Sequence, residues 1–139
     1  MSRWTVGAFA AIGIAVLVAG WVEYHGTERY SLSADVQQAR KYLQLIDSAE
    51  IKCFDLRGRY LTLDELGPRG CGNLDGAIST GAHDGYLFEV KTTDSRYTVR
   101  VHAASAKRLI SLYSDEERKV HLGTREKPAT SQSPLLSDR

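Results

Sequence analysis

This sequence of 139 residues lacks an excess of charge of either sign, because 18 lysines and arginines are balanced by 17 aspartates and glutamates. A net charge of +1 provides no basic field to gather phosphates and no acidic field to attract cations. Nucleic-acid binding through the release of counterions is therefore not expected. The length allows one modest domain, which excludes a multidomain enzyme.

Motifs for catalysis and for metal binding are also missing. The sequence has no CxxC or CxxCH, and its histidines stand without a second ligand type at a suitable spacing: His25, His83, His102 and His121. His83 beside Asp84 could act as an acid or base. Ser111, His102 and Asp115 could be combined on paper as a triad, but no nucleophile elbow accompanies them. We therefore expect no enzyme, no metal site and no cofactor.

The longest hydrophobic run covers residues 5–22 and contains no charged side chain. As a helix, these 18 residues would extend about 27 Å, close to the roughly 30 Å of the hydrocarbon core of a bilayer. The run therefore predicts a single transmembrane helix in contact with the lipid bilayer. One alternative is a signal peptide that is cleaved near Gly20, although the run is longer than a typical signal sequence requires. The other is a buried helix of a soluble protein.

The orientation of this helix follows from the charges beside it. Arg3 and the N-terminal amine precede the run, and no cationic excess follows it, so residues 1–4 are expected in the cytoplasm. Aromatic side chains suited to the two headgroup levels mark its ends: Trp4, Trp21 and Tyr24. These features predict a single-pass protein of the cytoplasmic (inner) membrane, with its C-terminal domain in the periplasm or outside the cell.

Small residues recur at every fourth position of the run: Gly7, Ala11, Ala15 and Ala19. On a helix they form one stripe that permits the close approach of another transmembrane helix. We expect this stripe to contact integral membrane subunits of a larger complex. The competing explanation is chance, since eight of the 18 residues in the run are glycine or alanine.

A second helix is predicted after a polar linker over residues 23–33. Ser33 serves as its N-cap, Asp35 lies in its first turn where a negative charge suits the helix dipole, and Gly58 ends it. The apolar positions share one face: Val36, Ala39, Leu43, Ile46, Ala49 and Cys53. The polar positions expected in water are Gln37, Arg40, Lys41, Gln44, Asp47 and Lys52. Such a helix covers a core on one side only.

The rest of the domain changes from loop to strand character. Thr62 and Glu65 match a capping box for one short turn, and the Gly-rich stretch 69–85 predicts an irregular surface loop. The hydrophobic period then becomes two, which predicts four strands, at residues 86–91, 97–103, 109–114 and 119–122. They form an antiparallel meander with the helix across its apolar face, an α+β fold.

The outward side chains of Lys91, Arg100 and His102 form a mild cationic patch on this sheet. A solvated sheet face explains the patch better than a ligand site does. The extracytoplasmic domain is expected to cover residues 34–123. The tail, residues 124–139, has no apolar period and is expected to be disordered or to order only on a partner.

The two cysteines, Cys53 and Cys71, lie 18 residues apart in a compartment that the predicted topology makes oxidising. The spacing and location predict a disulfide, worth about 3 kcal/mol in the chain-entropy model. Two free thiols, or a pairing with another chain, are the alternatives.

Three stretches give the sequence a likeness to a known family: AEIKCFDLRGRYLTLDEL from residue 49, DGYLFEV from residue 84 and SLYSDEERKV from residue 111. With them the chain resembles the type IV pilins and pseudopilins, in which a membrane-spanning N-terminal helix leads into a helix packed on a small antiparallel sheet. The resemblance implies a pilin-like fold over most of residues 33–122 and assigns no catalytic residue.

The sequence departs from that family at its N-terminus. No Gly-Phe junction precedes the hydrophobic run, and no acidic residue precedes Glu23, whereas the family carries a buried Glu thought to set the register of the incoming subunit. This loss suggests that charge-guided assembly has been abandoned. We therefore expect a non-catalytic accessory subunit that docks in a larger photosynthetic, respiratory or secretory complex and caps or stabilises it from the outer side. The alternative is a minor pilin or pseudopilin of a type II secretion or type IV pilus-like filament.

Overall fold

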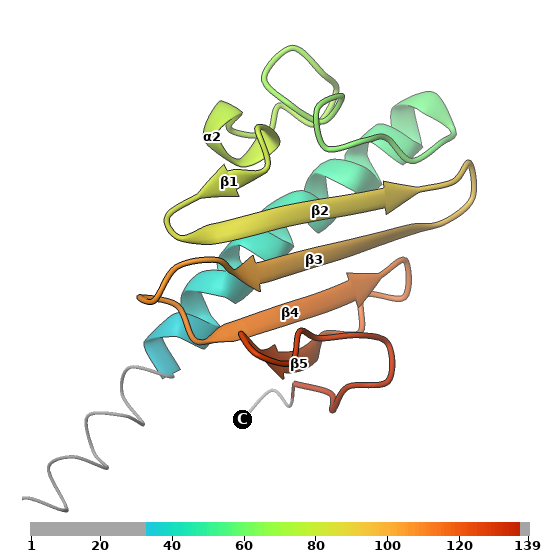
Figure 1. Cartoon of the computed structure of the whole chain (residues 1–139). Helices are drawn as coiled ribbons and strands as arrows, with labels where there is room; N and C mark the ends of the chain where they lie inside the picture. The colour runs from blue at the N-terminus through green and yellow to red at the C-terminus, as the bar shows by residue number, and fades with distance from the viewer. Residues whose placement is uncertain (1–32, 137–139) are drawn as a thin grey trace, which may run out of the picture. The chain divides into compact units, whose positions relative to one another are not determined.

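The computed structural model describes residues 33–136 (Figure 1). Within this part of the chain, no helix is both long and apolar enough to cross a bilayer. The predicted transmembrane run, residues 5–22, lies outside the described residues, together with its stripe of small residues and the aromatic side chains at its ends.

A long helix occupies residues 33–57 and crosses one face of the sheet (Figure 1). The predicted apolar positions lie in the core: Ala39, Leu43, Ile46, Ala49 and Cys53 are buried, and Val36 packs against them. Gly58 ends the helix as predicted, since it has a φ of +70° and its N–H lies 2.8 Å from the carbonyl oxygen of Phe54. Ser33 is itself helical, so its prediction as the N-cap is wrong.

The buried face of this helix is wider than the apolar pattern predicts. Tyr42, Asp47 and Glu50 are buried as well, although Asp47 was expected in water. The sheet provides the reason, because the hydroxyl groups of Tyr97 and Ser114 donate to the two carboxylate oxygens of Asp47 at 3.0 and 3.2 Å. A polar side chain can lie in a core where such partners compensate its lost water.

Five strands form the sheet in sequence order, each antiparallel to the next. They are β1 (Ala82–His83), β2 (Tyr86–Thr92), β3 (Tyr97–Ala103), β4 (Ile110–Asp115) and β5 (His121–Thr124). The α+β class and the antiparallel meander are confirmed, but the sheet has one strand more than predicted. Its register places apolar side chains side by side, with Phe88 opposite Val101, Val101 opposite Leu112, and Leu112 opposite Leu122. Phe88, Val101 and Leu112 are buried in the core, and Leu122 packs against it.

The extra strand lies in the stretch predicted as an irregular loop, after the short helix α2 (Gly76–Ser79). Asp75 caps α2, because its side chain accepts the N–H of Ala77 at 2.7 Å. β1 then turns into β2 through Asp84 and Gly85, which have φ angles of +52° and +81°. β1 pairs over only two residues, too few for a hydrophobic period to reveal it.

The tail also differs from the disorder expected of it. Residues 125–136, which we call the C-terminal strap, fold back against β4 and β5 (Figure 1). Ala129 is 1% exposed, and its N–H donates to Ser111 Oγ at 2.7 Å. Near its end, the strap accepts the N–H of Leu122 at Pro134 O and donates the N–H of Leu136 to Val120 O, both at 2.8 Å. These bonds cover the outer edge of the sheet without any apolar period in the strap.

The disulfide between Cys53 and Cys71 is confirmed, with sulfur atoms 2.06 Å apart and Cα atoms 5.4 Å apart. It ties the last turns of the long helix to the loop that leads to α2. The predicted capping box of Thr62 and Glu65 is formed in part. The N–H and the hydroxyl of Thr62 both donate to Glu65 Oε2, at 2.9 and 3.0 Å.

Candidate functional site

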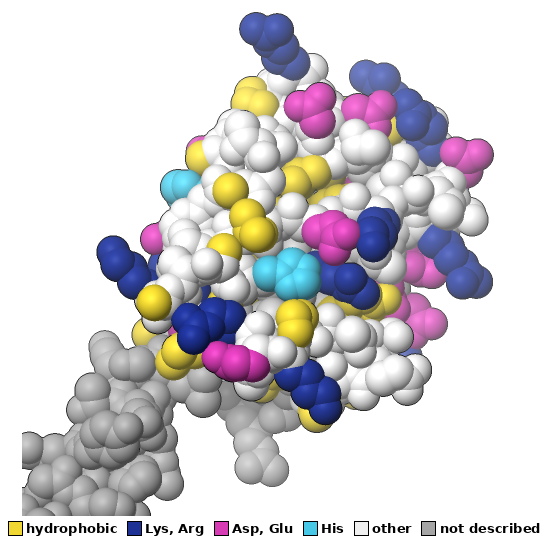
Figure 2. All heavy atoms as spheres, in the orientation of Figure 1, with side chains coloured by type: hydrophobic (Ala, Val, Ile, Leu, Met, Phe, Trp, Pro, Cys, Tyr) yellow, Lys and Arg dark blue, Asp and Glu magenta, His cyan; other side chains and the backbone are white. Residues whose placement is uncertain are grey.

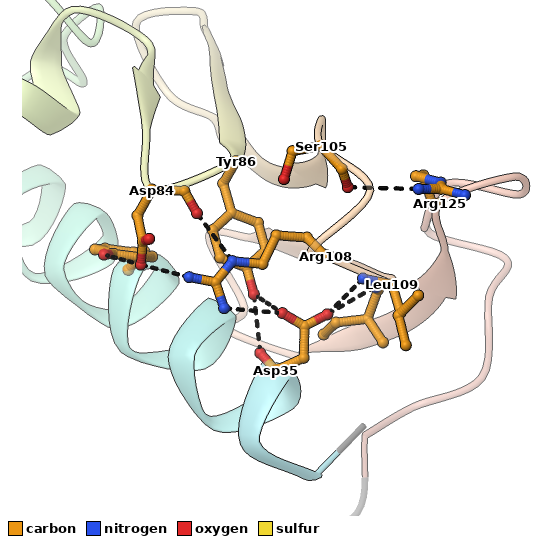
Figure 3. Close-up of polar contacts among 9 residues, drawn as sticks. Asp35, Asp84, Tyr86, Ser105, Arg108, Leu109 and Arg125 are labelled. Atoms are coloured by element: carbon orange, nitrogen blue, oxygen red, sulfur yellow. Dashed lines mark hydrogen bonds and ion pairs between the residues drawn. The ribbon is translucent and has the colours of Figure 1, made fainter. Parts of the chain in front are cut away.

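The largest polar assembly in the described part of the chain surrounds Asp35, which lies near residue 33 at the start of the long helix. Figure 3 shows Asp35 facing Tyr86 at the start of β2 and Arg108 and Leu109 in the connection between β3 and β4. Asp84, in the turn before β2, lies on the other side of Arg108. We call Asp35, Asp84, Tyr86 and Arg108 the Asp35 cluster.

The carboxylate of Asp35 is buried and accepts several hydrogen bonds. The backbone N–H groups of Leu109 and Ile110 donate to Oδ2 at 2.7 and 3.1 Å. The Tyr86 hydroxyl donates to Oδ1, and the guanidinium of Arg108 lies 3.5 Å from the same oxygen. Asp35 therefore fastens the helix to the sheet, a function its predicted place in the first helical turn did not suggest.

Arg108 joins the two acidic residues of the cluster. Its guanidinium contacts Asp84 Oδ2 at 2.5 Å and Asp84 O at 2.9 Å, and its Cζ lies 4.7 Å from the centre of the Tyr86 ring. Burial raises the pKa of Tyr86, and the hydrogen bond to Asp35 raises it further. The phenol therefore remains a neutral donor at physiological pH. The cluster can hold together the helix, the turn that leads into β2 and the connection between β3 and β4. Each of its polar side chains is already bonded to another member of the cluster.

The residues considered for acid–base chemistry are occupied in the structure. Asp84 accepts from Arg108 and, at 3.2 Å, from the Tyr42 hydroxyl, while the His83 ring packs edge-on against Tyr42 with 5.8 Å between ring centres. The structure does not bring Ser111, His102 and Asp115 together as a triad. Ser111 donates to Thr124 O and accepts from the strap, whereas His102 faces Glu89.

Figure 2 shows cationic, acidic and histidine side chains gathered on one face of the domain. The cationic patch on the open face of the sheet is neutralised by Glu89. Its carboxylate lies 3.0 Å from Lys91 Nζ, 3.5 Å from Arg100 Nη1 and 3.8 Å from His102 Nε2. The hydrogen bond from Lys91 lowers the pKa of Glu89, and burial lowers the pKa of His102. The arrangement fits the solvated, charge-balanced sheet face that we preferred to a ligand site.

The burial of two carboxyl groups, those of Asp47 and Glu50, was not predicted from the sequence. Burial raises the pKa of Asp47 to about 6 and that of Glu50 to about 7. Both lie on the sheet-facing side of the long helix, and their partners lie ten or more residues away in sequence. On the helix, residue 47 follows the buried Leu43 by four positions, and residue 50 follows the buried Ile46 by four. This spacing places both carboxyl groups beside the apolar face and could have indicated their burial.

Metal-binding geometry is not found in residues 33–136, where no group of three or more His, Cys, Asp or Glu side chains could hold an ion. An open pocket of about 220 Å³ beside the disulfide is lined by side chains of both charges, among them Arg57, Arg69 and Asp64. Comparisons with protein families, with curated proteins and with solved structures give no match to this chain.

Proposed function

We propose that this protein is a non-catalytic accessory subunit, anchored by residues 5–22, that docks in a larger complex of the cytoplasmic membrane. The candidate hosts are photosynthetic, respiratory and secretory complexes. The domain formed by the long helix and the sheet caps or stabilises the host from the outer side. Its integral membrane partners contact the stripe that includes Gly7, Ala11 and Ala15.

The Asp35 cluster is the observation that best supports this proposal. It fastens the helix to the sheet within a few residues of the point where the chain leaves the predicted linker. A domain that caps or stabilises a neighbour needs a rigid internal attachment of this kind. A binding protein that closes around a ligand would instead need mobile segments here.

Purification in mild detergent tests the proposal. The full-length chain should co-elute with integral membrane proteins in a constant ratio, and the mature chain should retain its N-terminal run by intact-mass measurement. Elution of the chain alone contradicts the docking. A mature polypeptide trimmed near Gly20 and free in the periplasm contradicts the anchor itself.

The variant Ala11→Leu tests the stripe. A bulky side chain on this face separates the two helices, so recovery with the partners should fall at least tenfold while the domain remains folded. Gly13→Leu is the matched control, since residue 13 lies roughly 200° around the helix from residue 11 and should leave co-purification unchanged. Equal recovery of both variants would remove the stripe from the proposal.

A minor pilin or pseudopilin is the second candidate function. The helix on an antiparallel meander is consistent with the fold that the resemblance implies. A shortened, N-methylated mature terminus and recovery in sheared filaments would favour this candidate. Retention of Met1, or loss of only that residue, would favour the accessory subunit.

A further inference from the structure

Glu50 is a fully buried carboxyl group at the contact between the long helix and the rest of the domain. Its exposed fraction is 0%. Oε2 accepts the N–H of Leu61 at 3.0 Å, but the buried Oε1 has no hydrogen-bond partner among residues 33–136. An ionised carboxylate with an unpaired oxygen is costly in such surroundings, so the protonated form is favoured.

Asp47 lies three residues earlier on the same side of the helix and is 7% exposed. It is better satisfied than Glu50, because both of its oxygens accept a hydroxyl donor from the sheet. It also forms part of the wall of an open pocket of about 250 Å³, lined as well by Arg118 and Val120. Water reaches this end of the contact, whereas Glu50 lies deeper.

The charges around the two carboxyl groups give them unequal support. The titratable and charged groups that face them are Arg40 on the helix, Tyr60 and Glu65 after it, Tyr97 on β3, and Asp115 and Arg118 at the end of β4. Arg118 lowers the pKa of Asp47, and Asp115 raises it. Each charged neighbour that acts on Glu50, namely Asp47 and Glu65, raises its pKa.

We propose that Asp47 and Glu50, with Leu61, Tyr97 and Ser114 opposite them, form a proton-sensitive contact that holds the helix on the sheet in acid and loosens near neutral pH. We call these five residues the carboxyl seam. On ionisation, the charge attracts the Leu61 N–H more strongly, but the cost of burial and the repulsion from Asp47, one turn away, outweigh this bond and draw Glu50 toward water. This proposal does not depend on the host complex.

The disulfide sets the extent of this opening. Cys53 is one turn beyond Glu50 and remains tied to Cys71, so the loop that carries Leu61 cannot move far from the helix. The seam should therefore open locally in the oxidised protein. The exported location that we propose would expose it to the pH of the surroundings.

The direction of the pH effect follows from proton binding. Between the ordinary Glu value of 4.5 and about 7, the unfolded chain is ionised at Glu50 while the folded chain keeps the proton. Stability conferred by this proton is complete below pH 4.5 and is lost as the pH rises through 7. For Asp47 the corresponding window runs from 3.8 to about 6.

Urea unfolding of the full-length, oxidised chain in neutral detergent, followed by tyrosine near-ultraviolet circular dichroism, tests the seam. Between pH 6 and pH 8 the unfolding constant should rise about tenfold from Glu50 and about twofold from Asp47, or roughly twentyfold together. Glu50→Gln should reduce the rise to about twofold, because the amide still accepts from Leu61 but does not ionise. Amide exchange at Leu61, corrected for its intrinsic pH dependence, should accelerate over the same range only in the wild type.

Glu117→Gln is the matched control, since Glu117 is exposed and its pKa is lowered, mainly by the hydrogen bond from Lys119. This variant should retain the twentyfold rise. A wild-type rise below threefold, or the same rise in Glu50→Gln as in the wild type, overturns the proposal. If Glu50→Gln does not fold, a ¹³C titration of the Glu50 carboxyl in the wild type decides, and a pKa below 5 overturns the proposal.

Discussion

Three acidic side chains of one helix differ in how well the sheet satisfies them. Asp35 receives two backbone N–H groups, a phenol and a guanidinium, whereas Asp47 receives two hydroxyl groups. From the described part of the chain, Glu50 receives a single N–H group. The strength of each attachment should follow this order, because hydrogen bonds to a charged acceptor are stronger and compensate burial more completely.

Removal of the Asp35 carboxylate should therefore be strongly destabilising. Asp35→Ala leaves the N–H groups of Leu109 and Ile110 without an acceptor and takes one carboxylate from Arg108. We expect the free energy of unfolding to fall by roughly 2–4 kcal/mol in urea at pH 6. Asp55→Ala, an exposed change on the same helix, should lower it by less than about 0.5 kcal/mol. Comparable losses in both variants would show that the cluster has no special role.

The sequence could not reveal these side-chain partners. A position in the first helical turn offers Asp35 a local function beside the helix dipole, and nothing nearby indicates contacts with residues more than 70 positions later. The prediction that Asp47 is exposed to water was wrong for the same reason, since its hydrogen-bond donors lie on β3 and β4. Cys53 and Cys71 were predictable because only two cysteines exist and their bond does not depend on a local pattern.

At the scale of elements, periodic segments were predictable and aperiodic ones were not. The helix over residues 33–57 and the hairpin of β2 and β3 present a regular apolar face, so spacing alone indicates them. α2 and β1 are too short for a period and depend on the capping residue Asp75 and on a glycine turn. The C-terminal strap contains Pro, Ser and charge, a composition typical of disorder, and its backbone is held instead by β5.

Gly123 determines whether the strap can lie on the sheet. A Cβ atom there would stand 2.4 Å from the backbone nitrogen of Ala129 and 2.7 Å from Lys127 O. Gly123→Ala should therefore displace the strap and speed trypsin cleavage after Arg125 by tenfold or more, while the circular dichroism of the domain remains that of the wild type.

Gly76→Ala is the matched control for this prediction. The nearest atom to its added methyl group is Pro68 Cγ at 3.5 Å, an ordinary contact. Cleavage after Arg125 should be unchanged in this variant. Equal cleavage rates in both variants and in the wild type would mean that the strap does not need the close approach at Gly123.

At the scale of the whole molecule, the domain is small for a single core that must also bury three carboxyl groups. The helix is fastened near residue 35 by the Asp35 cluster and near its other end by the disulfide. Between these two attachments lies the carboxyl seam, the part of the contact whose carboxyl groups receive the fewest hydrogen bonds. A helix held at both ends can loosen in its middle without leaving the sheet, which is the behaviour that we infer for the seam.

Loss of the disulfide should turn this local opening into a cooperative loss of stability. In the double variant Cys53→Ser, Cys71→Ser, the free energy of unfolding at pH 6 should fall by about 3 kcal/mol, because the unfolded chain gains the freedom that closure of an 18-residue separation removes. Leu61 should then exchange its amide hydrogen by global unfolding, so its exchange should follow the global unfolding constant at both pH 6 and pH 8. Thiol labelling of the denatured wild type should give no reaction before reduction. A double variant as stable as the wild type would mean that the bond constrains neither state, and the seam would have to be limited by some other contact.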